Sequence, residues 1–421
     1  MSVNNSELLN ELTKKAEAGN SLAQYELAEY YKSTDNLSRY ILWLIKSAEN
    51  GYADAQVDLA FCFDEGSILE QNYAEAIKWY KKAAEQDRDD AQFNLAVIYF
   101  NGDGVNQDFA EAVKWYTKAA KLGHTDAIFS LAVLYKTGTG TEVDMKKAVN
   151  LFKSAAAKGH VKAQYNLGLL YFKGEGVEKD IFDAKRWFTE AAKQGNVNAE
   201  CYLAQCYEIL GTSEDLTYAF KLYEKSAEDG SEEAFIKLAS CYEKGRGVRT
   251  DKVKAVGMYK QLALKGNATA QYYYAMCLKD GIGVRTNVNE AAKWFGKSAD
   301  RGYTDAKYQL GRCYEIGEGV NRDFGKAVYW YSRAAWEGNP NAQYCLGLCY
   351  ENGKGAIMNI NKAVEWYTKA VEAGVPGAQC SLAILYCTGK GVEKDLVKAK
   401  ELFKMSAMQG NKTAKEYLAK I

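Results

Sequence analysis

Apolar residues recur along the whole chain in paired short segments, each with the spacing of an amphipathic helix. In the clearest copy, residues 159–194, they include Ala163 and Leu170 in the first half and Ala184 and Phe188 in the second. Residues three or four apart share one face of a helix, so each half predicts a helix with one buried side. Between the halves stand two glycines, which let the chain reverse, and an aspartate suited to cap the second helix. The unit is therefore predicted to be a helical hairpin.

The hairpin repeats with an almost constant period. Its starting Gly, or a substitute, recurs at intervals of 36 residues nine times, 35 once and 32 once. Such a period is the signature of a stacked repeat array. We predict an all-α protein with an N-terminal capping helix in residues 1–18, eleven repeats in residues 19–409 and a C-terminal capping helix in residues 410–421. The repeats start near residues 19, 51, 87, 123, 159, 195, 230, 266, 302, 338 and 374. The apolar residues of the N-terminal cap expected to face the first repeat are Leu8, Leu9 and Leu12.

The repeat also carries a family resemblance. In the copy at 159–194, Ala163 is followed by LeuGly, Tyr171, the link GEGV, Asp180, TrpPhe and AlaAla. This pattern resembles the SEL-one-like repeat (SLR), a relative of the tetratricopeptide repeat, and it recurs along almost the whole chain. The resemblance implies an α/α right-handed superhelical solenoid that acts as an adaptor between proteins. It implies no particular partner.

Composition narrows the classes of function. Lys plus Arg and Asp plus Glu both number 54, so no global basic field exists and nucleic acid is not an expected partner. The N-terminus lacks the basic start and apolar core of a secretory signal, and the chain has no long apolar run. We therefore expect a cytoplasmic protein with no direct membrane insertion.

The ten cysteines fit this expectation. Six of them share one column, eleven residues after the unit start, where a free thiol serves as a small hydrophobe on the inward side of the first helix. The resemblance implies that disulfide-stapled relatives pair a second-helix cysteine with one on the following first helix, an arrangement missing here. We expect reduced, buried thiols, with disulfides as the alternative. The column contains Cys62, Cys206, Cys241, Cys277, Cys313 and Cys349.

Two further columns describe the stack rather than a function. Nine residues after each start stands only Ala or Gly, such as Gly168 or Ala275, as a close approach of helices requires. One second-helix position is mostly Trp, and an aromatic stripe at this period is expected in the core rather than around a cofactor. The tryptophans are Trp43, Trp79, Trp115, Trp187, Trp294, Trp330 and Trp366.

No sequence motif indicates catalysis or the binding of a cofactor or a metal. The GxG link could cradle phosphate, but six copies read GxGV, none follows a predicted strand and none continues into GKS or GKT, so a structural turn is preferred. The two histidines, His124 and His160, each follow a unit-starting Gly and are most simply helix-start residues. No His and Cys spacing typical of zinc and no catalytic triad is apparent. We expect no catalytic, cofactor-binding or metal-binding residues.

The positions that the repeat leaves free point to a partner. Ten residues after the start, four consecutive repeats carry apolar residues that the hairpin does not need, edged by polar residues three positions earlier. By the resemblance this face of the first helix lines the concave side, where apolar anchors and amides suit a peptide or a partner helix. The alternative is a stripe closed off by tight curvature, or merely tolerated drift. The predicted contact residues are Asp58, Phe61, Asn94, Val97, Ser130, Val133, Asn166, Leu169, Tyr202 and Tyr273.

Trp336 stands in a column that is otherwise mostly charged, and it is either an accessory contact or a packing residue against the next turn. Together these features predict a non-enzymatic adaptor or scaffold that binds one or more proteins or peptides along its concave face. Two alternatives remain. One is a hydrolase-type activity, as proposed for secreted, cysteine-rich relatives. The other is a purely structural spacer.

Overall fold

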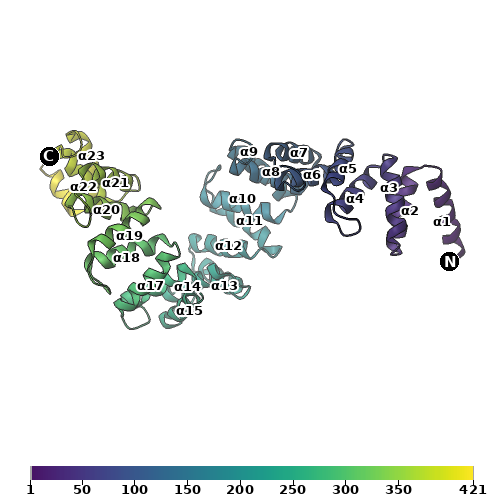
Figure 1. Ribbon diagram of the computed structural model, residues 1–421. Coiled ribbons are helices and arrows are strands. Elements are labelled where there is room, and N and C mark those ends of the chain that lie inside the picture. Colours follow the sequence, from purple (N-terminus) through teal and green to yellow (C-terminus); the bar gives the residue numbers. More distant parts are fainter. Residues whose placement is uncertain (1, 421) are drawn as a thin grey trace. The chain divides into compact units, whose positions relative to one another are not determined.

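The computed structural model describes residues 2–420, with side chains described from Glu7 onward. In this part of the chain all regular structure is helical, in 24 consecutive helices (Figure 1). The chain divides into two compact units, and the boundary along the chain lies between Gly211 and Thr212. The predicted all-α array of hairpins is confirmed.

The first unit opens with α1 and then alternates first helices (even numbers) and second helices (odd numbers). Its helices are α1 (Ser2–Glu17), α2 (Ser21–Ser33), α3 (Leu37–Glu49), α4 (Ala53–Glu65), α5 (Tyr73–Ala84), α6 (Asp89–Asn101), α7 (Phe109–Leu122), α8 (Thr125–Thr137), α9 (Met145–Ala157), α10 (Val161–Lys173), α11 (Ile181–Lys193) and α12 (Val197–Leu210).

The second unit continues the same alternation. Its helices are α13 (Ser213–Glu228), α14 (Glu232–Lys244), α15 (Lys252–Leu264), α16 (Ala268–Asp280), α17 (Val288–Asp300), α18 (Thr304–Ile316), α19 (Phe324–Trp336), α20 (Pro340–Asn352), α21 (Ile360–Glu372), α22 (Pro376–Thr388), α23 (Leu396–Met408) and α24 (Lys412–Leu418).

The link between the two helices of a repeat is built as its residues predict. Asp180 caps α11 by accepting hydrogen bonds from the amides of Phe182 and Asp183. The second glycine of the link lies against the start of the preceding second helix. At Gly319, with φ of 74°, a Cβ atom would overlap the backbone carbonyl of Val288. The link is therefore a close-packed contact between repeats, which explains its glycines without a phosphate.

The core of nearly every repeat centres on one aromatic ring of the second helix. These rings are almost fully buried, and the Ala or Gly column of the first helix packs against them. A Cβ atom on Gly168 would lie 2.6 Å from Phe188, and one on Gly347 would lie 2.5 Å from Tyr367. The predicted close approach of helices at this column is thus confirmed for the glycine-containing repeats. The ring column was not predicted as such; in the first repeat its position holds Leu44, and its most buried rings are Tyr80, Phe152, Phe188, Tyr223, Tyr259, Phe295, Tyr331, Tyr367 and Phe403.

The tryptophan column lies one position earlier, toward the surface of the second helices. Five of its seven members are buried, as predicted, whereas Trp187 and Trp330 are only partly buried. A lysine one turn later covers several of these rings, as Lys118 does at 4.0 Å from the ring centroid of Trp115. The tryptophan column therefore belongs to the packing of the repeat, with a lysine ammonium group over several of its rings.

Neighbouring repeats are also joined by a column of buried polar side chains at the start of the first helices. Gln164 Nε2 donates to the Ala156 carbonyl of the preceding second helix, and Gln164 Oε1 accepts from Gln194 at 2.8 Å. In another repeat this column holds Lys307, which is buried and forms an ion pair with Glu337. These bonds satisfy polar groups at the joint between repeats.

Two smaller predictions concern the N-terminal cap and the thiols. Leu9 and Leu12 pack on the core from α1, but Leu8 is 62% exposed, so its predicted inward orientation is wrong. The rotation of a terminal helix is set by one neighbour only, and periodicity does not define it to one residue. All ten cysteines are free thiols, eight of them buried. Burial raises the pKa of the Cys313 thiol to about 11.

Candidate functional site

The predicted apolar stripe lies on four successive first helices of the first unit. We call this surface the first-helix face and define it by the stripe and its polar neighbours: Asp58, Phe61, Asn94, Val97, Ser130, Val133, Asn166 and Leu169. Phe61 on α4 is 50% exposed, and Val97 on α6, Val133 on α8 and Leu169 on α10 are partly exposed. The chain therefore presents apolar side chains to solvent at the same position of consecutive repeats.

The polar members of this face are partly engaged within the chain. Asp58 accepts a hydrogen bond from the Tyr25 hydroxyl at 2.8 Å, and Asn94 Nδ2 donates to the Tyr80 hydroxyl at 3.2 Å. Asn166 Nδ2 donates to the backbone carbonyl of Lys162 at 2.8 Å. Asp58 and Asn94 thus join neighbouring helices, and Asn166 bonds within its own helix, so the case for a partner rests mainly on the apolar positions.

Ser130 faces the buried ring of its neighbouring second helix. Its hydroxyl hydrogen-bonds the phenol of Tyr116, while burial raises the pKa of that phenol to about 12. Ser130 also lines the cleft described below. It is thus the one predicted polar residue with both an internal bond and a place in an open depression.

The two predicted tyrosines are part of the packing between helices. Tyr202 stacks on Phe188, with ring centroids 5.3 Å apart, and meets Tyr165 of the preceding first helix at 5.9 Å. Tyr273 stacks on Tyr259 at 5.3 Å. Tyr273 lies on α16, in the second unit, whereas the first-helix face belongs to the first.

A cleft of about 470 Å³ opens on the first helices of the first unit, between α6, α8 and α10. Its floor is made by stacked rings. His160 lies on Phe129 with ring centroids 4.5 Å apart, and Phe93, under His124 in the same way, lines one side. Asp126, Ser130 and Lys162 also line the cleft. All of its lining side chains come from three consecutive repeats.

His160 contacts both its own helix and the preceding repeat at this cleft. His160 Nδ1 accepts from the amide of Ala163 at 3.0 Å, and Nε2 lies 3.1 Å from Asp126 Oδ1 of the preceding repeat. The prediction that both histidines are helix-start residues is confirmed. Sequence reasoning missed that their rings also cover an aromatic residue of the repeat before. The signal was available, since an aromatic residue precedes each histidine by 31 positions.

Trp336 follows the packing alternative, and its role as an accessory contact stays a prediction. The ring is 75% exposed, yet it meets Trp366 of the next repeat edge-on, at 5.2 Å and 90°. Lys369 lies 4.9 Å from the ring centroid of Trp336 and 4.2 Å from that of Trp366. Trp336 is therefore a packing residue whose outer face remains open to solvent.

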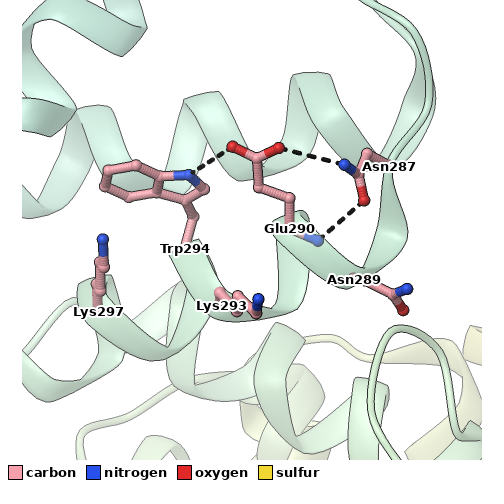
Figure 2. Close-up of a pocket in the computed structure, with 6 residues that line it drawn as sticks. All are labelled: Asn287, Asn289, Glu290, Lys293, Trp294 and Lys297. Atoms are coloured by element: carbon pink, nitrogen blue, oxygen red, sulfur yellow. Dashed lines mark hydrogen bonds between the residues drawn. The ribbon is translucent and has the colours of Figure 1, made fainter.

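A second depression, on α17, is explained by the repeat itself. Figure 2 shows the Glu290 carboxylate accepting from Trp294 Nε1 at 3.4 Å and from Asn287 Nδ2 at 3.2 Å. Lys297 lies 3.9 Å from the centroid of the Trp294 ring. In another repeat Trp115 Nε1 donates to Glu111 in the same way. This depression is the surface of a helix cap and its tryptophan, not a candidate ligand site.

Residues 2–420 show neither a metal site nor a membrane-crossing helix. In that part of the chain no three His, Cys, Asp or Glu side chains gather as they would to hold a metal ion. Nor does any helix described there have the length and apolar character needed to cross a membrane.

Comparison with known proteins agrees with the repeat structure. The model of the Sel1 repeat matches residues 21–39, 53–87, 89–124, 125–160, 161–196, 197–231, 233–267, 268–303, 304–339, 340–375 and 376–411. A search of curated proteins found no match.

Two solved structures are similar over much of the chain. One is a protective antigen present in uropathogenic Escherichia coli strains and displaying an SLR fold. It is 34% identical over 98% of this chain and 89% of that chain, with a TM-score of 0.64. The other is a Sel1 repeat protein from Oxalobacter formigenes, 29% identical over 77% of this chain and 93% of that chain, with a TM-score of 0.52. With eleven matched repeats and the hairpin geometry that they predict, the chain belongs to the Sel1 repeat family.

Proposed function

We propose that this protein is a non-enzymatic adaptor that holds a segment of a partner protein along the first-helix face of its first unit. The observation that supports this most directly is the run Phe61, Val97, Val133 and Leu169, four apolar side chains at one position of successive repeats. Phe61 is half exposed and the other three are partly exposed, although Val97 and Val133 also pack on the core. Repeat arrays generally use such extended surfaces for binding, because each repeat adds one equivalent contact position.

The cleft between α6, α8 and α10 extends the same surface. It offers a place where a side chain of the partner segment could be enclosed, with Phe129 below and Asp126 and Lys162 at the rim. Binding surfaces are commonly dominated by a few such anchored side chains. No specific observation favours the hydrolase-type alternative. A structural spacer would leave the exposed apolar stripe without a role.

The proposal is tested by affinity capture with the wild-type chain and the variant Val97→Glu, Val133→Glu, Leu169→Glu. The matched control places three glutamates on exposed apolar residues of the same unit away from the stripe, as Leu122→Glu, Val143→Glu, Phe182→Glu. We expect one defined partner to be lost only from the stripe variant, with helicity and melting temperature kept in both. An identical partner list for all three proteins would favour the spacer.

A further inference from the structure

The balanced charge of the chain hides a strong separation within the first unit. The four first helices α2, α4, α6 and α8 carry nine aspartates and glutamates against two lysines. The four second helices α3, α5, α7 and α9 carry eleven lysines and arginines against three glutamates. Opposite signs therefore gather on different helices of these four hairpins, and the part of the first-helix face on α4, α6 and α8 lies in a negative field. The part on α10 does not, because that helix carries Lys162 and Lys173 and no carboxylate.

Carboxylates surround the apolar stripe at its N-terminal end. Asp58 stands one helical turn before Phe61, and burial raises its pKa. The hydrogen bond from Tyr25 and the charge of Lys32 act against this rise, and the carboxylates of Glu29 and Asp90 add to it. These two residues belong to the preceding and following first helices, so the negative charges of three repeats act on one another. Lys32 pairs with Glu29, and Arg88 pairs with Asp54 and Asp90, so these two cations offset part of the negative charge but are outnumbered by the four carboxylates Glu29, Asp54, Asp58 and Asp90.

We infer that the segment held on the first-helix face is basic and amphipathic, with apolar side chains on Phe61, Val97 and Val133 and lysines or arginines beside Glu29, Asp58 and Asp90. This inference rests on the proposed function and adds the chemistry of the partner. Charge complementarity of this kind raises the association rate and selects the partner, while the apolar anchors supply most of the affinity.

The opposite arrangement, an acidic segment on the second helices, is less well supported. Lysines there already lie on tryptophan rings of the chain, as Lys82 does at 4.1 Å from the ring centroid of Trp79 and Lys118 at 4.0 Å from that of Trp115. These contacts recur with the repeat period and belong to its packing. The depression of about 660 Å³ on α9 and α11 is lined by Arg186 and Glu190 together, so it offers no surface of one sign to an acidic segment.

The test is a selection of random 16-residue peptides on the immobilised full chain, followed by fluorescence anisotropy of the enriched peptides. The variant Glu29→Gln, Asp58→Asn, Asp90→Asn removes three charges from the face. The control Glu85→Gln, Glu142→Gln, Glu178→Gln removes three exposed charges elsewhere in the same unit.

We expect enriched peptides that combine apolar residues with net positive charge. Their affinity should fall about tenfold in the face variant at low salt, and this difference should shrink at high salt because exposed charges are screened. The control should bind like the wild type.

Several results would overturn the inference. Enriched peptides that are neutral or acidic, or equal affinities for the face variant and its control, would exclude a basic partner. If such peptides still lose binding in Val97→Glu, Val133→Glu, Leu169→Glu, the proposed function stands and only the inference fails. If no enriched peptide is sensitive to that stripe variant, both fail. Concentration-dependent self-association that the stripe variant abolishes would instead identify a second copy of the chain as the occupant.

Discussion

The strictest residues of the repeat are small because a ring lies directly opposite them. Where the column holds glycine, a methyl group would overlap the facing ring, as at Gly311, where a Cβ atom would lie 2.7 Å from Tyr331. In repeats with alanine at this position, such as the one containing Ala275, we expect the two helices to lie slightly further apart. The size of this one residue therefore sets the local spacing of the hairpin.

Gly311→Ala should thus destabilise the protein even though alanine favours helices. We expect a loss of about 1 kcal/mol in the free energy of unfolding, because an extra methyl group overpacks the contact. The control is Gly296→Ala on α17, where a Cβ atom meets nothing within 4 Å. There the helix propensity of alanine should act alone and stabilise by about 0.5–1 kcal/mol. Denaturant unfolding measures both changes, and equal signs would contradict the account.

The buried ring column follows a second rule at the scale of single residues. Four of its tyrosines donate their hydroxyls to a carboxylate sixteen positions earlier, as Tyr367 does to Glu351 at 2.6 Å and Tyr331 to Glu315 at 2.5 Å. In the four repeats whose ring is a phenylalanine, the earlier position holds Lys136, Phe172, Lys279 or Cys387 instead. Tyr116 and Tyr223 are exceptions, since Phe100 and Tyr207 stand sixteen positions before them. In the four repeats that have the carboxylate, the phenol and the carboxylate form a matched pair.

Tyr367→Phe should cost about 1–3 kcal/mol, because the partly buried Glu351 carboxylate loses its donor. The double variant Tyr367→Phe, Glu351→Lys, which copies the repeat with Phe295 and Lys279, should recover most of this loss in thermal or denaturant unfolding. Two single changes with simply additive costs would argue against a matched pair.

The same pair predicts a dependence on alkaline pH. Burial and then Glu351 raise the pKa of Tyr367 above its ordinary value of about 10. The folded state therefore holds this proton more tightly than the unfolded state. Stability should be intact below about pH 10 and should fall as the pH rises above it. Tyr367→Phe should reduce the slope of that fall, and an unchanged slope would contradict the assignment.

Between elements, the joint from one repeat to the next depends on a buried glutamine and a donor thirty positions later. Gln86 and Gln409 supply that donor to Gln56 and Gln379, at 2.9 and 3.0 Å. In the repeat of Gln92, the donor position holds Leu122, and Gln92 Oε1 accepts no hydrogen bond from the described residues. The contact between these two repeats therefore lacks a hydrogen bond that the equivalent contacts at Gln56 and Gln379 have.

Leu122→Gln should complete this joint. Leu122 is half exposed, so little apolar packing is lost, and the new amide reaches Gln92 as Gln194 reaches Gln164. We expect a gain of about 0.5–1.5 kcal/mol in the free energy of unfolding, the net value of one buried hydrogen bond. Leu122→Ala controls for the loss of the leucine and should bring no gain; a gain of equal size there would show that the hydrogen bond is irrelevant.

The sequence predicted the elements better than their side-chain partners. Period and spacing defined the hairpins, the caps and the columns, because stacking requires the same residue types in every copy. They did not define what Asn94 and Asn166 bond to, since a small rotation of the helix decides whether such a side chain points to a partner or to its own chain. The Tyr367–Glu351 pairing was visible as a correlation between columns, but interpreting it required knowing that the two positions face each other.

For the whole molecule, the features that could bind a partner concentrate in the first unit. The exposed stripe, the cleft between α6, α8 and α10 and the negative first helices all lie there, whereas Tyr273 and Trp336 belong to the second unit. The other residues that recur at the same position of successive repeats are explained by packing between helices. The central claim is therefore that the first-helix face of the first unit contacts the partner.

Site-specific photo-crosslinking tests this claim most directly. A benzophenone side chain is placed singly at Phe61, Val97 or Val133, and as controls at the exposed Leu122 and Phe182. After irradiation in a lysate of the source cells, we predict one cross-linked partner common to the three stripe positions and absent from both controls. A partner trapped equally at Leu122 and Phe182, or only there, would contradict the account.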